Sequence, residues 1–174
     1  MFLVSVYFDD HSSKTLQRYI DSVADITDNR FMTNHKVPPH LTLAAIEARN
    51  ADSLIPVLEQ IEGELISDKV QIVSTGMLLP YVLYVTPVLN HYLQTLQTTV
   101  YDAFSKIPEV RINKYYDKSQ WFPHITIGKQ LTRQQMMLGV DTMIGKFVPM
   151  EAAVVKLALS SVNPHRDLVW VELK

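Results

Sequence analysis

The chain has 174 residues, carries 16 Lys and Arg against 18 Asp and Glu, and contains no cysteine. This length accommodates one domain, and the near-balanced charge excludes a protein that neutralises many phosphates along duplex nucleic acid. A chain without cysteine has no disulfide, thiolate nucleophile or zinc–cysteine site. No apolar run approaches the roughly 20 residues that span a bilayer, so we expect no membrane partner. The lack of cysteine and of a signal-peptide pattern favours a cytoplasmic protein, and we expect a monomer.

Strand-like and helix-like patterns alternate along the first half of the chain. Branched and aromatic residues mark the strands, apolar residues at helical spacing mark the helices, and Val37-Pro38-Pro39 resists helix formation. The predicted elements are a strand Phe2–Phe8, a helix from Ser12-Ser13 to Ile26, a strand His40–Ile46, a helix from Asp52 to Leu65, and strands Val70–Leu78 and Tyr81–Val88.

The second half repeats this pattern. The predicted elements are a helix His91–Lys106, a polar and aromatic loop Arg111–Gln120, a strand His124–Lys129, a helix capped by Thr132 and ending near Phe147, and strands Glu151–Val162 and Asp167–Leu173 joined by a turn over Asn163–Arg166. Each half runs helix, proline, histidine-containing strand, helix and strand pair. We therefore expect a single α+β domain over residues 1–174 with internal duplication, in which two lobes place their matching strands across a central cleft.

The two histidine-containing strands begin with one shared motif. It reads Pro39-His40-Leu41-Thr42-Leu43 in the first half and Pro123-His124-Ile125-Thr126-Ile127 in the second. A bare His-x-Thr is expected about 0.4 times by chance in this composition, but the full pattern only about 0.001 times. Side chains alternate along a strand, so each histidine and its threonine project to one face while the aliphatic residues pack on the other.

Two imidazoles and two hydroxyls around one point are suited to the cleavage of a phosphodiester. One histidine can remove the proton from the attacking oxygen while the other protonates the leaving oxygen, because the imidazole pKa lies near neutrality. The hydroxyls of Thr42 and Thr126 can hold the non-bridging oxygens of the phosphate. A single histidine on a strand is more often structural, but the symmetric pair has no packing rationale. We therefore interpret His40 and His124 as catalytic.

With these two motifs, the sequence resembles the 2H phosphoesterase superfamily, also called the LigT-like or 2′-5′ RNA ligase family. The resemblance rests on both motifs, on the Phe-Pro-His sequence that leads into the second, and on the closing hairpin KLALSSVNPHRDLVWVELK. It implies a bilobal LigT-like fold, with two pseudo-symmetric lobes of antiparallel sheet plus helices around a cleft. It also implies metal-independent chemistry, without a cofactor, at 2′,3′-cyclic phosphates or 2′-5′ linkages of RNA ends or nucleotides.

Further substrate-binding candidates are weaker. Relatives often carry an aromatic residue at the position of Tyr84, which either stacks a base or packs in the core. Trp121 either forms a base platform or packs its loop onto the lobe. Many relatives carry arginine where this chain has Lys129, which either steers an anion or is simply solvated. His165, in the closing turn, is interpreted as turn chemistry, and the three remaining histidines (His11, His35 and His91) are interpreted as structural or exposed.

Two other functions remain open at this stage. A non-catalytic protein that binds nucleotides or RNA ends would keep the same cleft, although binding alone does not require two proton-transfer groups. A metalloenzyme would combine His40 and His124 with a carboxylate, but the sequence has no His/Asp/Glu triplet at ligand spacing. The substrate, the direction of the reaction and the assignment of acid and base to the two histidines stay open.

Overall fold

A computed structural model describes residues 1–162 and 164–174 of the chain, so one residue of the predicted turn, Asn163, lies outside the described residues. The strands of this part of the chain are β1 (Phe2–Phe8), β2 (Leu41–Glu47), β3 (Asp68–Leu78), β4 (Val82–Pro87), β5 (Arg111–Ile112), β6 (Ile125–Gly128), β7 (Met150–Val162) and β8 (His165–Glu172). The helices are α1 (Asp10–Thr27), α2 (Phe31–Asn34), α3 (Ile55–Ile61), α4 (His91–Phe104) and α5 (Arg133–Lys146), with 3₁₀ turns η1 (Glu62–Glu64) and η2 (Lys114–Tyr116).

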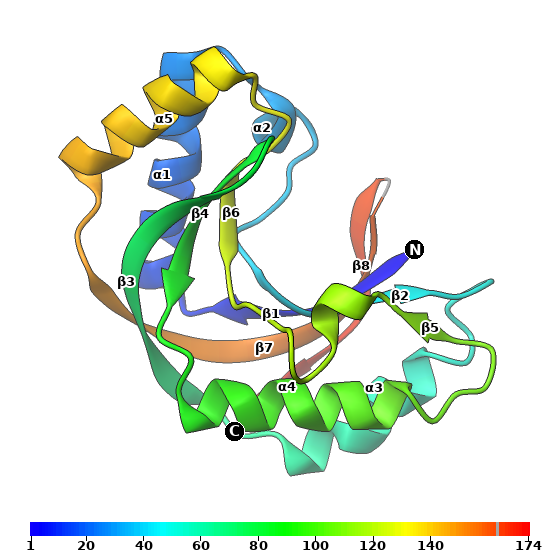
Figure 1. The fold of residues 1–174 in the computed structure, drawn as a ribbon. Helices are drawn as coiled ribbons and strands as arrows, with labels where there is room; N and C mark the ends of the chain where they lie inside the picture. The colour runs from blue at the N-terminus through cyan, green and yellow to red at the C-terminus, as the bar shows by residue number, and fades with distance from the viewer. Residues whose placement is uncertain (163) are drawn as a thin grey trace.

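Within the described residues, eight strands form one antiparallel sheet. Its order is β5-β2-β1-β7-β3-β4-β6, and β8 pairs with β7 off this path. The sheet is strongly bent, so that β3, β4 and β6 form one side and β1, β2, β7 and β8 the other (Figure 1). The bend brings β6, at one end of the path, opposite β2, near the other end. The predicted α+β class and bilobal arrangement are confirmed, with a continuous sheet linking the two lobes.

The strand order has a pseudo-two-fold symmetry. The motif strand β2 pairs with β1, which pairs with β7, and the other motif strand, β6, pairs with β4, which pairs with β3. The chain follows the same symmetry, because β1-α1-β2-α3-β3 is followed by β4-α4-β6-α5-β7. Two equivalent repeats therefore carry the two motifs.

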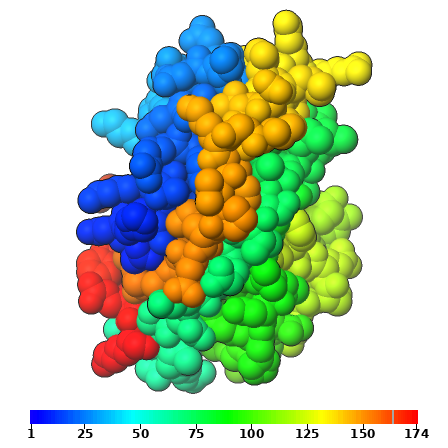
Figure 2. All heavy atoms as spheres, turned by 90° about the vertical axis from the view of Figure 1, so that its left-hand side faces the viewer, coloured from blue at the N-terminus to red at the C-terminus, as the bar shows by residue number. Residues whose placement is uncertain are grey.

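The repeats are interwoven rather than stacked side by side. Helix α1 of the first repeat packs against β6 and α5 of the second, and α4 of the second repeat packs against β2 and α3 of the first. The outer surface shows α1 and α5 side by side (Figure 2). Strands β3 and β7 pair with each other at the middle of the sheet and join the repeats. Each lobe therefore combines elements from both halves of the sequence, whereas the repeated pattern alone suggests one lobe for each half.

Two helices begin at residues other than those predicted. Helix α1 starts at Asp10 rather than after Ser12-Ser13, because Oδ1 of Asp9 accepts a hydrogen bond from the Ser12 amide at 3.0 Å. Helix α3 starts at Ile55 rather than after Asp52, and no side chain caps it. The Asp52 amide instead donates to Oδ1 of Asn50, which keeps this segment in a turn.

Three short elements were not predicted: α2, β5 and η2. Strand β5 lies within the predicted polar loop, and it adds to β2 through the pairs of Ile46 with Ile112 and Glu47 with Arg111. Such short elements carry too few residues to show a periodic pattern. Their position matters, because η2 packs against the motif strand β2 and α2 packs against the motif strand β6.

The apolar faces of the sheet and the helices meet in one hydrophobic core. Leu41 and Leu43 on β2 and Ile125 and Ile127 on β6 are all buried in it. These are the alternate positions of the two motifs, so the aliphatic face of each motif strand packs inward as predicted. The histidine and threonine of each motif are thereby displayed on the opposite, inner face of the bent sheet.

The capping box of α5 provides a test of the fold. The Thr132 side chain accepts a hydrogen bond from the Gln135 amide, and the Gln135 side chain accepts one from the Thr132 amide. Thr132→Ala removes the first of these bonds, so we expect the free energy of unfolding in urea to fall by about 1 kcal/mol. The matched control is Thr95→Ala at an exposed position within α4, where alanine favours the helix. An equal loss of stability in both variants would contradict the capping role.

Candidate active site

The two motif histidines have the same local geometry. Each stands immediately before its strand, and its Nδ1 lies near the carbonyl oxygen two residues earlier: 2.8 Å for His40 and Pro38, and 2.9 Å for His124 and Phe122. A proline separates the partners in both cases, Pro39 and Pro123. Because proline fixes its own φ, the carbonyl is held at the same place relative to each ring.

These bonds determine which nitrogen is available for chemistry. A carbonyl oxygen can only accept, so Nδ1 of each ring carries the proton and donates it. In the neutral imidazole, Nε2 is then the unprotonated nitrogen. Both rings are therefore set to accept or deliver a proton at Nε2.

His40, Thr42, His124 and Thr126 line one cavity of about 290 Å³, which lies between the two motif strands. The predicted tetrad is thus brought together from two segments that are far apart in the sequence. The Thr42 hydroxyl also accepts a hydrogen bond from Ser5 on the neighbouring strand β1, at 3.3 Å between the oxygens. This bond leaves the Thr42 proton to be donated elsewhere, such as to a bound anion.

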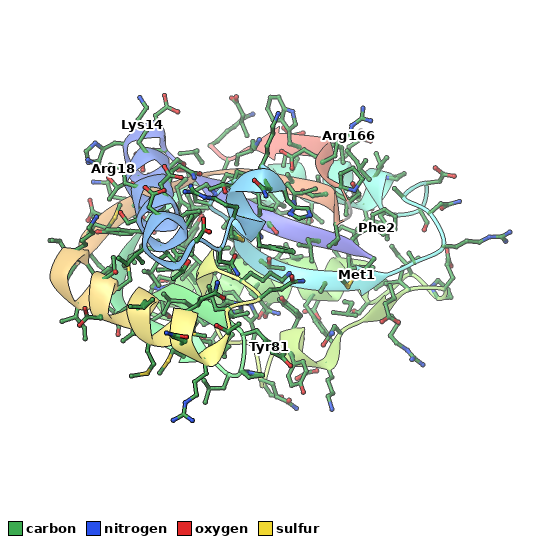
Figure 3. All side chains as sticks on the ribbon, turned by 90° about the horizontal axis from the view of Figure 1, so that it is seen from above. Met1, Phe2, Lys14, Arg18, Tyr81 and Arg166 are labelled. Atoms are coloured by element: carbon green, nitrogen blue, oxygen red, sulfur yellow. The ribbon has the colours of Figure 1, made fainter. Side chains whose placement is uncertain are left out.

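The other cavity-lining residues come from several elements. They are Met1, Leu3, Phe31, Met32, His35, Val37, Ala45, Val82, Asn113, Tyr116, Lys129, Val162 and His165. Figure 3, seen from above, shows Met1 between the hairpin that carries Arg166 and the turn that carries Tyr81. The start of the chain, the first residue of β4 and the β7–β8 hairpin all contribute to the lining of the cavity.

Burial governs the protonation of both motif histidines. The pKa of His40 is lowered to about 4, mainly by burial and in addition by repulsion from His165, His124 and Lys129, although the bond to Pro38 opposes this. Burial also lowers the pKa of His124, opposed by its bond to the Phe122 carbonyl. Both rings are neutral at neutral pH when no anion is bound.

The interpretation of His165 as turn chemistry is wrong. His165 begins β8, lines the cavity, and stacks on His40 with 5.5 Å between ring centroids and 25° between ring planes. The two motifs do not indicate a role for this residue in the site, because it belongs to neither of them. Its position depends on the pairing of β8 with β7, and of β7 with β1, which no local pattern reveals.

A polar network on the same face of the sheet supports His165. The Tyr7 hydroxyl donates to Oδ1 of Asp167 at 2.7 Å and lies 3.3 Å from Nε2 of His165. Asp167 also accepts from Ser160 at 2.7 Å and pairs with Lys156 at 3.1 Å. Burial alone would raise the pKa of Asp167, but these hydrogen bonds lower it below its ordinary value, so the carboxylate stays charged.

Two of the predicted substrate-binding residues do not line the cavity. Trp121 is 7% exposed, and its Nε1–H donates to the Thr42 carbonyl oxygen at 3.0 Å, which ties the approach to β6 onto β2. Tyr84 packs edge-on against Phe122 and His124, with ring centroids 5.4 and 5.7 Å apart. The packing interpretation therefore describes both aromatic residues better than the base-stacking one.

The third candidate, Lys129, does line the cavity, and its side chain is exposed. Its Nζ lies 5.7 Å from the centre of the Phe31 ring, and Phe31 stacks on His35 with 4.4 Å between centroids. His35, interpreted above as structural or exposed, is thus exposed and also lines the cavity. This side of the cavity presents a cation and an aromatic pair.

Across residues 1–162 and 164–174, no three His, Asp or Glu side chains are grouped as metal ligands. No helix of the same residues is long and apolar enough to cross a bilayer.

Comparison with known proteins identifies relatives by family and by fold. The model of the family described as the 2′-5′ RNA ligase superfamily matches residues 8–165. No protein of curated function matches the sequence. Among solved structures, Escherichia coli LigT complexed with 3′-AMP is similar with 14% identity and a TM-score of 0.67, over 99% of this chain and 97% of that chain.

Two further solved structures have the same fold. One is described as a phosphoesterase and has 15% identity and a TM-score of 0.66, over 99% of this chain and 97% of the other. The second is a protein of Thermus thermophilus with 16% identity and a TM-score of 0.64, over 99% of this chain and 97% of the other.

The low pKa of His40 predicts how stability depends on pH. The unfolded chain binds a proton at this residue near pH 6.5, but the folded chain does so only near pH 4, so protonation favours unfolding. The free energy of unfolding should therefore fall as the pH drops from about 6.5 towards 4, and be unaffected by His40 above that window. When the free energy of unfolding is measured in urea at several pH values across this range, His40→Gln should reduce its slope against pH.

The control for this measurement is His11→Gln on the exposed surface of α1, which should keep the wild-type slope. His124 and His165 also have lowered pKa values, so the slope in His40→Gln should be smaller but not zero. The carboxylates with lowered pKa values lose their contribution only below their ordinary pKa of 3.8, outside this window. An unchanged slope in His40→Gln would contradict the burial of a neutral His40.

Proposed function

The chain belongs to the 2′-5′ RNA ligase superfamily, and on this premise we propose that it is a metal-independent phosphoesterase. Its proposed substrates are 2′,3′-cyclic phosphates or 2′-5′ phosphodiesters of RNA ends or nucleotides. The observation that carries the proposal is the pair of imidazoles on opposite strands of one cavity, each with Nδ1 bonded to a carbonyl and Nε2 left for proton transfer. A cavity of about 290 Å³ is suited to one nucleotide or chain end rather than to a duplex.

In this proposal His40 is the general base. Its pKa of about 4 keeps it neutral at neutral pH, with the lone pair of Nε2 available. In hydrolysis of a cyclic phosphate, His40 takes a proton from water while the water oxygen forms a bond to phosphorus. Burial, His165 and Lys129 all oppose its protonation in the free enzyme, so the base form predominates before substrate binds.

His124 is then the general acid. Burial lowers its pKa in the free protein, but a phosphate anion beside the ring favours the charged form and raises that pKa again. The protonated Nε2 gives its proton to the ribose oxygen as the phosphorus–oxygen bond breaks. The ring remains aligned because its Nδ1–H stays on the Phe122 carbonyl throughout. Ligation uses the same two groups in reverse.

Thr42, Thr126 and Lys129 are proposed to hold the phosphate. The Thr42 hydroxyl accepts from Ser5, which orients its proton away from that partner. Lys129 supplies a positive charge at the cavity without the planar, two-pronged geometry of arginine, so we expect it to attract the phosphate rather than fix its orientation. The related LigT was solved with 3′-AMP, and a nucleoside phosphate of this size is consistent with the proposed substrate class.

The first test removes each imidazole in turn. His40→Ala and His124→Ala should each lower kcat for 2′,3′-cyclic nucleotides by about 100- to 10,000-fold, because each removes one proton-transfer step. Hydrolysis is measured by chromatography of the 2′- and 3′-nucleotide products, with a chelator present throughout. The matched control, His11→Ala, replaces an exposed histidine of α1 and should keep wild-type activity.

Two results would contradict this proposal. Wild-type protein that binds the cyclic nucleotide without converting it would indicate the non-catalytic binding function. Activity that disappears with the chelator and returns with a divalent metal would indicate a metalloenzyme.

The second test addresses the threonines. Thr126→Val keeps the shape of the side chain but removes the hydroxyl, and it should lower kcat/KM by roughly 100-fold if that hydroxyl stabilises charge on the phosphate. Thr126→Ser retains the hydroxyl and serves as the matched control, so most of the activity should remain. Steady-state kinetics on a 2′,3′-cyclic nucleotide separates the two. A Thr126→Val variant as active as wild type, or a Thr126→Ser variant as impaired as Thr126→Val, would contradict this role of the hydroxyl.

A further inference from the structure

A third imidazole stands beside the general base, outside both motifs. His165 lies at the start of β8, and its ring is nearly parallel to that of His40, at 25° and 5.5 Å between centroids. Stacked rings shield part of one another's faces from water. The stack therefore supplies part of the burial that keeps His40 neutral.

His165 is itself held in place by a hydrogen-bonded chain. The Tyr7 hydroxyl has one proton and gives it to Oδ1 of Asp167 at 2.7 Å, so its oxygen accepts from Nε2–H of His165 at 3.3 Å. Ser160 donates to the same oxygen of Asp167, Oδ1, at 2.7 Å, and Lys156 donates to Oδ2 at 3.1 Å. These groups come from β1, β7 and β8, which are three adjacent strands of the sheet.

We propose that His165 is a positioning residue, which stacks on His40, fixes the plane of that ring and keeps water from its face. Tyr7 and Asp167 hold His165 in this place. The inference rests on the proposed function, because it gives His165 its role through the general base. It assigns no contact between His165 and the reacting atoms.

Burial and the nearby cationic side chains favour the neutral form of His40, and its bond to the Pro38 carbonyl opposes this. The ionisable groups that line the cavity with His40 or stand close to its ring are the amino terminus at Met1, Tyr7, His35, Tyr116, His124, Lys129, His165 and Asp167. Asp167 is the acidic side chain of this group, and its oxygens are engaged by Tyr7, Ser160 and Lys156. No carboxylate of the group therefore pairs with His40, and loss of the stack would expose this ring to water.

The test compares three variants, of which two replace His165 and one replaces Tyr7, the residue that holds it. His165→Ala removes the ring, so water reaches His40 and its pKa should rise from about 4 towards the ordinary 6.5. His165→Phe keeps a flat ring over His40 and should keep the low value. Tyr7→Phe removes the anchor but not the stack, and should give an intermediate value. The pKa of His40 is measured by NMR titration of the imidazole, with thermal melts to show that each variant is folded.

The same variants are then assayed for activity against pH. If the base in His165→Ala titrates near 6.5, only about one tenth of it is neutral at pH 5.5, so kcat/KM there should fall about tenfold relative to wild type. At pH 8 the loss should be less than about twofold, and His165→Phe should follow the wild-type curve. A residue needed only for stability would instead lower activity equally at both pH values.

Two outcomes would overturn the inference. An unchanged His40 pKa in His165→Ala would show that the stack does not shield the ring. A large rise in KM in both His165 variants, with the acid side of the profile unmoved, would make His165 a substrate-binding residue. The NMR titration needs no turnover, so it tests the positioning role even if the protein hydrolyses no phosphodiester, and the two proposals can fail separately.

Discussion

The hydrogen bond from each motif imidazole to the carbonyl two residues earlier is the constraint on which the proposed chemistry depends. Without it either ring nitrogen could carry the proton, and the ring could turn about its side-chain bonds. With it, Nδ1 of His40 and of His124 is committed to the Pro38 and Phe122 carbonyls, and Nε2 is committed to chemistry. The proline between the partners makes this a property of the backbone, so the same device appears in both repeats.

The bend of the sheet brings the two motif strands together into one site. Strands β2 and β6 are separated by four strands along the order of the sheet, and only the curvature brings their inner faces together. Trp121 helps to hold the two strands together, because its indole N–H donates a hydrogen bond to the Thr42 carbonyl oxygen and so ties the segment before β6 to β2. A residue first interpreted as a candidate base platform thus serves the site by holding its two sides together.

The sequence predicts well what depends on neighbouring residues. The alternation of Leu41 and Leu43 with His40 and Thr42 is enough to place this histidine and threonine on one face of their strand, and Thr132 with Gln135 marks the start of α5. The repeated order of elements and the family resemblance both predicted the bilobal arrangement. These predictions succeed because a strand or a cap is determined within a few residues.

Features that depend on distant pairing were missed. His165 meets Tyr7, 158 positions away, only through the registers of β8 with β7 and of β7 with β1. The exchange of helices between repeats is equally invisible, because α1 shows an ordinary apolar face whichever strands it covers. Register and partner choice arise from the whole sheet, and a single sequence records neither.

The interweaving of the repeats has a consequence for assembly of the chain. Half of the polypeptide, ending after β3, would possess a motif strand and the helices α1, α2 and α3 but would lack β7, the partner that both β1 and β3 require. Such a fragment would present two open sheet edges and uncovered apolar helix faces, and it would complete itself only by joining a second copy of the same segment. Folding is therefore a cooperative event of the entire polypeptide, and the cleft forms only once synthesis has passed the penultimate strand.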